Sequence, residues 1–260
     1  MNTFVTSDRE PAIAVDIYGK ETGVPVILLH GFPDTVKTWS SLVSTLQDMD
    51  IQLIVIHMRG YTRSDIPSNN HFSLRSLAED VMRVADNLQL AKAFVIGHDW
   101  GASTAYALAH LAPERFVAMV TLAIPPLSVT KHQLWDRLVR PHNVYLRWQS
   151  FALYLMRRRN MKHIDHLYHL WSPNWVNNKQ HIDEVKTALK NPYRMQAALS
   201  YYRASLSPED QTLFSQNPLI PITIIYGADE PLVRQRVFQI AARQPSYNVI
   251  WSIKQDTGLI

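Results

Sequence analysis

The segment Phe94-Val95-Ile96-Gly97-His98-Asp99-Trp100-Gly101-Ala102-Ser103 decides the fold of this chain. It passes from a short apolar run through the pattern Gly-x-Asp-x-Gly into small residues, which predicts a strand, a sharp turn and a helix. Such a turn strains its central residue, here Asp99, and lifts the side chain above the sheet. Glycine is needed at positions 97 and 101, because a Cβ there would collide with the neighbouring strand and helix. A carboxylate held in this way can attack a saturated carbon, displace an oxygen or a halide, and leave an alkyl ester on the protein.

Outward from this turn, short apolar runs alternate with helical patterns along most of the chain. A continuous apolar run such as Val24–Leu29 is typical of a strand buried on both faces of a sheet. The alternation predicts an α/β fold with a mostly parallel sheet and helices on both faces. Strands are predicted at residues 4–7, 12–18, 24–29, 51–56, 93–96, 116–124, 220–226 and 247–253, the first two as an antiparallel edge. Helices are predicted at residues 36–47, 73–88, 100–111 and 232–243.

The sequence between residues 127 and 218 differs from the rest of the chain. It contains no strand-like run of this kind and is rich in Trp, Tyr, His and Arg. We interpret it as a helical cap inserted between two strands of the core. The chain then has a first part of the core at residues 1–126, the cap at residues 127–218, and a last part of the core at residues 219–260.

The composition narrows the classes of function. The 260 residues are 47% apolar and 18% charged, so a sizeable buried core is expected. The chain has no cysteine, which excludes disulfides and thiol catalysis. The net charge of +4 is not gathered into one long block, no apolar stretch is long enough to span a bilayer, and the first residues lack a signal-peptide core. The histidines at positions 163, 166 and 169 lack a clear set of carboxylate ligands. We therefore expect a cytoplasmic protein with no metal, no nucleic-acid partner and no membrane partner.

A second segment, Leu28-Leu29-His30-Gly31-Phe32-Pro33-Asp34, follows an earlier buried strand and complements the turn at Asp99. The backbone N–H of Phe32 is the expected oxyanion donor, paired with the N–H of Trp100. Gly31 lets the backbone approach closely, and His30 belongs to the same loop and is a further candidate site residue.

Three motifs together carry a family resemblance. His-Gly-Phe-Pro at residues 30–33, Arg-Gly-Tyr at residues 59–61 and Gly-His-Asp-Trp-Gly at residues 97–101 resemble the epoxide hydrolase branch of the α/β-hydrolase superfamily. The resemblance covers nearly the whole chain. It implies the α/β-hydrolase fold with an inserted cap, Asp99 as the nucleophile, a small apolar epoxide as the substrate, and no cofactor.

The related haloalkane dehalogenases are a competing interpretation. They share the aspartate nucleophile, and the Trp100 indole would suit their halide-binding role. They usually have a second halide donor just after His-Gly, commonly Asn, where this chain has Phe32. Fluoroacetate dehalogenases resemble Gly-His-Asp-Arg-Gly at the turn, and Trp100 in place of Arg weakens that alternative.

Opening of an epoxide requires an acid for the leaving oxygen, and the family uses cap tyrosines. The segment Ser200-Tyr201-Tyr202-Arg203-Ala204 resembles the family's Tyr-Arg pair and assigns this role to Tyr202. The second family tyrosine aligns best with Gln149, which is a hydrogen-bond donor but a poor acid. Tyr154 is a substitute candidate.

The acid and the histidine of the family should follow the nucleophile along the chain. The loop Gly227-Ala228-Asp229-Glu230-Pro231 puts Glu230 at the acid position, with Asp229 as the alternative. The histidine is expected after the last strand, but Leu259 follows Gly258 there. His98 precedes the nucleophile and is expected to point away from the site.

These departures shape the functional expectation. His57 and Thr62 replace the aspartate and glycine that usually flank the Arg-Gly-Tyr motif. With Leu259 at the histidine position, we expect a C-terminally truncated member that forms the ester on Asp99 and stalls after a single turnover. The alternatives are an inactive remnant that binds small apolar ligands, or a haloalkane dehalogenase. A missing terminal helix would leave apolar sheet surface uncovered, so a homodimer or low stability is expected.

Overall fold

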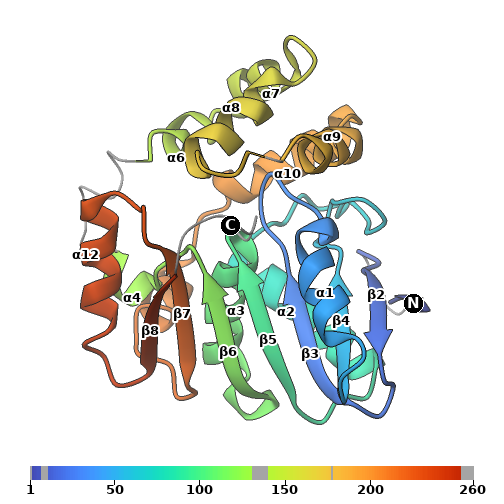
Figure 1. The fold of residues 1–260 in the computed structure, drawn as a ribbon, viewed down its shortest axis with the longest axis vertical. Helices are drawn as coiled ribbons and strands as arrows, with labels where there is room; N and C mark the ends of the chain where they lie inside the picture. The colour runs from blue at the N-terminus through green and yellow to red at the C-terminus, as the bar shows by residue number, and fades with distance from the viewer. Residues whose placement is uncertain (1, 7–10, 131–139, 177, 253–260) are drawn as a thin grey trace.

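A mostly parallel sheet forms the centre of the molecule (Figure 1). The computed structural model describes residues 2–6, 11–130, 140–176 and 178–252. Within these residues the sheet has eight strands in the order β1-β2-β4-β3-β5-β6-β7-β8. Their bounds are Asn2–Val5 (β1), Ala14–Gly19 (β2), Val24–Leu29 (β3), Ile51–Ile56 (β4), Ala93–His98 (β5), Phe116–Leu122 (β6), Ile222–Gly227 (β7) and Tyr247–Ser252 (β8). β2 is antiparallel to both of its neighbours, and β3 to β8 are parallel, which confirms the predicted antiparallel edge.

Helices cover both faces of this sheet. On one face, Val26 and Leu28 of β3 pack in a cluster with Trp39 and Val43, which belong to the short 3-10 helix Val36–Trp39 and to α1. On the other face, Ile27 and Leu29 of the same strand belong to the main core. The helices of the core are Ser40–Leu46 (α1), Leu74–Asn87 (α2), Trp100–Leu111 (α3) and Leu232–Ala241 (α12). Alternating side chains of each central strand therefore reach opposite layers, as the continuous apolar runs predict.

Several predicted strand boundaries differ from the structure by one or two residues, and the end of β6 is one of them. The strand predicted to reach residue 124 ends at Leu122. Ala123 has a φ of 66°, which lies outside the extended region. The chain therefore leaves the sheet at this point and turns toward the segment between β6 and β7.

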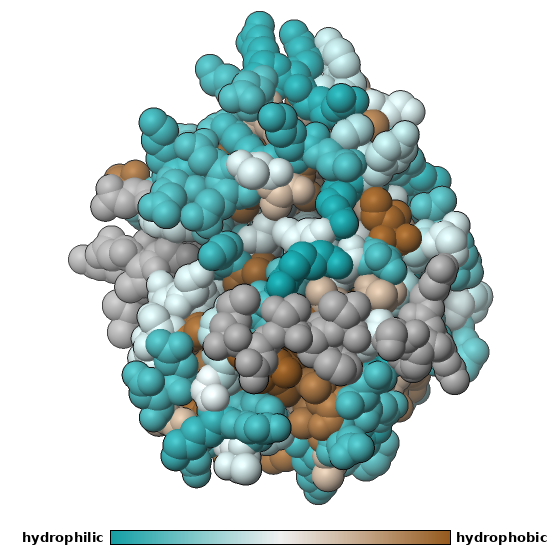
Figure 2. Space-filling model, turned by 90° about the vertical axis from the view of Figure 1, so that its right-hand side faces the viewer, coloured by the Kyte–Doolittle hydropathy of each residue, from teal (hydrophilic) through white to brown (hydrophobic). Residues whose placement is uncertain are grey.

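The segment between β6 and β7 is helical in its described residues. Its helices are Leu127–Thr130 (α4), His142–Tyr145 (α6), Gln149–Arg157 (α7), Lys162–Trp171 (α8), Lys179–Ala188 (α9), Pro192–Arg203 (α10) and Pro208–Leu213 (α11). Helices α6 to α10, called the inserted helices below, lie above the carboxyl ends of the parallel strands (Figure 1). Apolar residues of these helices such as Ile164 and Val185 are buried, whereas Phe151 and Leu170 are exposed. The face seen in Figure 2 is largely hydrophilic over this part of the molecule.

Helix α10 is fixed to the core through the loop that follows β4. The Tyr201 hydroxyl donates a 2.8 Å hydrogen bond to the carbonyl oxygen of Arg59. Near the other end of the helix, Nη1 of Arg194 donates a 2.8 Å hydrogen bond to the carbonyl oxygen of Ser64. These contacts set the rotation of α10, and thereby the direction of its neighbouring residue Tyr202.

Some expectations from the sequence stay predictions. Gly258 and Leu259 lie outside the described residues. The domain boundaries, the cytoplasmic location and self-association are likewise not tested by the fold. Among the residues that the structure describes, no helix combines the length and apolar character needed to cross a membrane.

Candidate active site

Asp99 lies at the bend between β5 and α3. Its φ of 52° and ψ of −113° fall in a region that residues with a side chain rarely occupy. The two flanking glycines allow the bend to close. A Cβ on Gly97 would lie 2.3 Å from the carbonyl oxygen of Gly101, and a Cβ on Gly101 would lie 2.1 Å from that of Leu29. The backbone therefore holds the Asp99 carboxylate at the carboxyl end of the parallel strands.

The loop after β3 contacts this carboxylate directly. The backbone N–H of Phe32 donates a 2.9 Å hydrogen bond to Oδ1 of Asp99. Gly31 permits the close approach, because a Cβ there would lie 2.4 Å from Cβ of Asp99 and 2.6 Å from its Oδ1. Trp100 is the first residue of α3, where amide groups have no partner within the helix. The Phe32 amide and the positive end of α3 together favour negative charge at this position.

Two cavities with partly shared linings meet at Asp99. Their volumes are about 290 Å³ and about 440 Å³. Asp99, Tyr202, Arg140 and Asn143 line both of them. The nucleophile position comes from the core, and the other three residues come from the segment between β6 and β7. The site therefore has room for a small molecule between core and inserted helices.

Tyr202 lies over the candidate oxyanion site. Its ring is edge-on to the rings of Phe32 and Trp100, with centroids 5.3 Å apart in both pairs. Burial, followed by the charge of Asp99, raises the pKa of Tyr202 well above 10, and the nearby Trp100 indole and Arg140 offset only part of this. The phenol is therefore neutral at pH 7 and carries a proton that it can donate.

Gln149 and Tyr154 are not brought to the site, which differs from the expectation. Nε2 of Gln149 donates a 3.2 Å hydrogen bond to Oγ of Ser200, and its Oε1 accepts one from Arg203. The Tyr154 side chain is 57% exposed, with the guanidinium of Arg158 5.1 Å from its ring centre. Neither residue is among the described residues that line the two cavities. The packing of α7 against α10 gives both side chains other partners, which the alignment of motifs does not reveal.

Glu230 and Asp229 both line the larger cavity, and each has a partner. Oε2 of Glu230 accepts a 2.8 Å hydrogen bond from Nε of Arg234. Oδ2 of Asp229 accepts a 3.1 Å hydrogen bond from Nδ2 of Asn174, a residue of the segment between β6 and β7. The Glu230 side chain is 19% exposed and forms a partly buried ion pair, whereas Asp229 is exposed.

The two histidines do not lie where the sequence predicts. His30 is not among the described residues that line the two cavities, whereas His98 lines one of them. His30 is fully buried, its Nδ1 lies 3.1 Å from the carbonyl oxygen of Gly31, and its Nε2 accepts a 3.2 Å hydrogen bond from the N–H of Met58. Burial lowers the pKa of His30 to about 4, so the imidazole is neutral at pH 7, and its hydrogen bonds hold the loop in place. His98, expected to point away, lines the larger cavity beside Asp99.

Sequence motifs missed three residues near Tyr202. Arg140 and Asn143 line both cavities. Tyr145 lies near enough to affect the pKa of Tyr202, and its own pKa is raised by burial to about 12. They come from an irregular, aromatic-rich stretch without periodicity. The only indication in the sequence that these residues could belong to a site was their polar side chains.

A buried ion pair joins the core loop to the inserted helices. Nε2 of His181 lies 3.1 Å from Oδ1 of Asp34, and the Tyr168 hydroxyl donates a 3.2 Å hydrogen bond to the carbonyl oxygen of Pro33. Asp34 and Tyr168 line the larger cavity. This network holds α8 and α9 over the loop that carries Phe32.

Comparisons with known proteins agree with this fold. A family model described as alpha/beta hydrolase fold matches residues 24–249. The AB hydrolase superfamily protein YfhM of Bacillus subtilis is 26% identical over 226 residues, which are 84% of this chain and 78% of that protein. An epoxide hydrolase of Caballeronia sordidicola is 30% identical over 127 residues, and epoxide hydrolase B of Mycobacterium tuberculosis is 35% identical over 106 residues.

The matches to the two epoxide hydrolases are partial. They cover 48% and 40% of this chain, and 39% and 30% of those proteins. A solved structure of a variant epoxide hydrolase from Bacillus megaterium superposes with a TM-score of 0.79 at 20% identity, over 96% of this chain and 92% of that one. The structural match supports the fold, and the family model supports the membership. The chain therefore belongs to the α/β-hydrolase fold family, and epoxide hydrolases are among its relatives.

Proposed function

We propose that this α/β hydrolase opens a small apolar epoxide through an alkyl ester on Asp99. The proposal rests above all on one observation, the 2.9 Å hydrogen bond from the Phe32 N–H to Oδ1 of Asp99 at the base of the cavities. An amide in that position holds one carboxylate oxygen and directs the other toward a substrate. It also stands ready to stabilise the negative charge that develops when the ester is later attacked.

In the first step, Oδ2 of Asp99 attacks an epoxide carbon. The ring C–O bond breaks, and its electron pair passes to the leaving oxygen. That oxygen takes the hydroxyl proton of Tyr202, which lines the same cavities and is neutral at pH 7 because its pKa lies well above 10. The product of this step is a hydroxyalkyl ester of Asp99.

The second step requires a water molecule to attack the ester carbonyl and a base to take its proton. The sequence has Leu259 where the family has its histidine. Glu230, the expected acid, pairs with Arg234. We therefore propose that each molecule of this chain reacts once with an epoxide and stalls as the ester.

The test is intact-mass measurement after incubation with an aryl epoxide such as styrene oxide. The wild-type chain should gain the mass of one epoxide molecule, and peptide mapping should place it on Asp99. Asp99→Asn should gain nothing, and Tyr202→Phe should gain the same mass more slowly. Sustained diol formation over many turnovers would contradict the single-turnover proposal. The absence of both adduct and diol would contradict the reaction itself.

One observation favours a second candidate, a haloalkane dehalogenase. Nε1 of Trp100 is buried beside Asp99 and makes no hydrogen bond of normal geometry among the described residues. An indole N–H in that position suits a departing halide. Halide release from 1-bromobutane, without an adduct from styrene oxide, would replace the first proposal by this one. Ligand-induced thermal shifts without either reaction would indicate a binding protein.

A further inference from the structure

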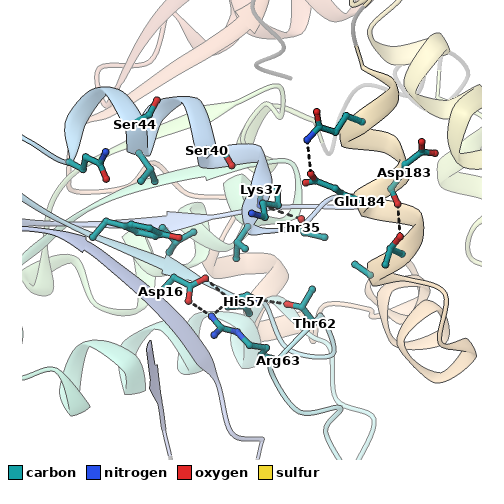
Figure 3. A pocket seen from close by; sticks show the side chains of 18 of the residues that line it. Asp16, Thr35, Lys37, Ser40, Ser44, His57, Thr62, Arg63, Asp183 and Glu184 are labelled. Atoms are coloured by element: carbon teal, nitrogen blue, oxygen red, sulfur yellow. Dashed lines mark hydrogen bonds and ion pairs between the residues drawn. The ribbon is translucent and has the colours of Figure 1, made fainter. Parts of the chain in front are cut away.

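A groove separate from the Asp99 cavities lies between the core and α9 (Figure 3). Its volume is about 1130 Å³. It shares no lining residue with the Asp99 cavities among the described residues. The groove is bounded by α1 on one side and α9 on the other, and its labelled side chains include Asp16, His57, Thr62 and Arg63.

Three of these side chains form a continuous hydrogen-bonded chain. The Thr62 hydroxyl contacts Nδ1 of His57, and Nε2 of His57 lies 3.0 Å from Oδ2 of Asp16. His57 is only 4% exposed and Asp16 only 5% exposed. With the ring hydrogen on Nε2, Asp16 accepts it and Nδ1 accepts the threonine hydroxyl, whereas the guanidinium of Arg63, 2.8 Å from Nε2, favours the other tautomer because it can only donate. A hydroxyl, an imidazole and a carboxylate in this order are the elements of nucleophilic catalysis by an alcohol.

The backbone at Thr62 is strained. Its φ is 37°, in the left-handed region where a β-branched residue is an outlier. Strain of this kind collects at functional sites and persists only where the surroundings enforce it. Here the hydrogen bond to His57 helps hold the conformation, and Thr62 lines the groove at a half-buried position.

The surroundings of the three hydrogen-bonded side chains favour a neutral His57, which can act as a base, over a protonated one. Burial lowers the pKa of His57 in spite of the charge of Asp16, so the imidazole is neutral at pH 7. The guanidinium of Arg63 contacts Asp16 and lies 2.8 Å from Nε2 of His57. Its side chain is 42% exposed, and it places a positive charge beside the carboxylate of Asp16 and Nε2 of His57, whereas Thr62 contacts the other ring nitrogen.

We propose that Thr62, His57 and Asp16 form a second catalytic site, which hydrolyses neutral esters bound in this groove. Val36, Val43 and Tyr18 give the groove apolar walls, whereas Lys37, Asp183 and Glu184 supply charges of both signs. An uncharged ester with a short apolar acyl group therefore fits better than a substrate of one strong charge. This site is independent of the reaction proposed for Asp99.

The chemistry balances with water as the second reactant. Oγ1 of Thr62 bonds to the ester carbonyl carbon while its proton passes to Nδ1 of His57. The C–O bond to the alcohol breaks, and the alcohol leaves with the proton from His57. Water then gives a proton to His57, and its oxygen bonds to the acyl carbon. The bond between this carbon and Oγ1 of Thr62 breaks, and His57 returns the proton to Oγ1.

The test uses p-nitrophenyl acetate with the whole chain carrying Asp99→Asn, which removes the nucleophile of the other site. Thr62→Val should reduce ester hydrolysis by about 100-fold or more. Thr62→Ser keeps a hydroxyl and should stay within about 10-fold of the Asp99→Asn rate. Thr212→Val is the matched control, because Thr212 lies on α11, is not among the described residues that line the groove, and bonds through its hydroxyl to the carbonyl of Pro208 in the same helix. This control should leave the rate unchanged.

A fluorophosphonate probe gives an independent readout. Peptide mapping should locate its adduct on Thr62, and Thr62→Val should remove that adduct while thermal unfolding stays cooperative. Absence of ester hydrolysis, an adduct elsewhere, or a Thr62→Val rate equal to that of Thr212→Val would each overturn the proposal. Failure of the Asp99 reaction would appear separately, as the lack of an epoxide adduct in the wild-type chain.

Discussion

Nε of Arg234 lies 2.8 Å from Oε2 of Glu230, one helical turn earlier in the chain. Nη2 of the same guanidinium donates a 2.7 Å hydrogen bond to the carbonyl oxygen of Ala123, at the end of β6. The carboxylate expected to orient a histidine is therefore held by an arginine at the edge of the larger cavity. This arrangement links the start of α12 to the strand that leads into the inserted helices.

Removal of the guanidinium by Arg234→Met should lower the free energy of unfolding by about 2–4 kcal/mol. The reason is that Glu230 is left as a largely buried carboxylate without its cation. Urea denaturation followed by tryptophan fluorescence measures this change. The double variant with Glu230→Gln should recover part of the loss. An unfolding free energy equal to that of wild type in Arg234→Met would show that the pair contributes nothing.

The substitution Gly31→Ala should slow formation of the Asp99 adduct by about 100-fold. The new Cβ would lie 2.4 Å from Cβ of Asp99, so either the loop or the carboxylate has to move. A displacement of this size commonly reduces catalysis by about 100-fold. Intact-mass kinetics with styrene oxide measure the rate, and far-UV circular dichroism checks the fold. An adduct rate near that of wild type would exclude the close approach of Gly31 and Asp99.

Tyr201 and Tyr202 are adjacent but should respond differently to loss of the hydroxyl. Tyr202→Phe should slow ester formation by roughly 10²-fold to 10⁴-fold, because the leaving oxygen loses its proton donor. Tyr201→Phe should mainly lower stability, by about 1 kcal/mol, because it loses the 2.8 Å hydrogen bond to the Arg59 carbonyl. Equal effects of the two variants on the adduct rate would contradict the assignment of Tyr202.

The pair of His181 and Asp34 should make stability depend on pH. Burial alone would lower the pKa of His181, but the hydrogen bond to Asp34 and its charge outweigh this and raise it above 6.5. Burial opposes the corresponding change in Asp34, whose pKa is nevertheless held below 3.8 by the hydrogen bond from His181. A raised histidine pKa stabilises the fold below the unfolded value and loses this effect as the pH rises through the folded value. A depressed aspartate pKa acts in the opposite direction at low pH.

The stabilising effect of this pair is therefore complete between about pH 4 and pH 6.5 and declines above that range. We expect the unfolding free energy of wild type to fall more steeply above pH 6.5 than that of His181→Gln. Urea denaturation at a series of pH values tests this. Parallel curves for the two proteins would rule out a contribution from His181.

The turn at Asp99 could be predicted because its causes are local. The apolar run, the two glycines at fixed spacing and the small residues that follow leave one conformation without a collision. The same holds for the loop at Phe32, which must follow a buried strand next to β5 in a parallel sheet. Both segments lie at strand ends, so their meeting follows from the topology alone.

The composition of the cavity was decided by tertiary packing. On a helix, a shift of one residue turns a side chain by about 100°, so a motif alignment that is uncertain by one position cannot give its direction. Gln149 and Tyr154 accordingly turn to other partners, and Arg140, from a stretch without periodicity, lines both cavities. The pairing of Glu230 with Arg234 also depends on how α12 packs against β6 and β8. The sequence by itself determined the strand, turn and helix at Asp99 and the backbone strain of that residue, because these depend on neighbours in the chain. Only the tertiary structure decided which polar groups face Asp99, because helix rotation is set by contacts between segments far apart in sequence.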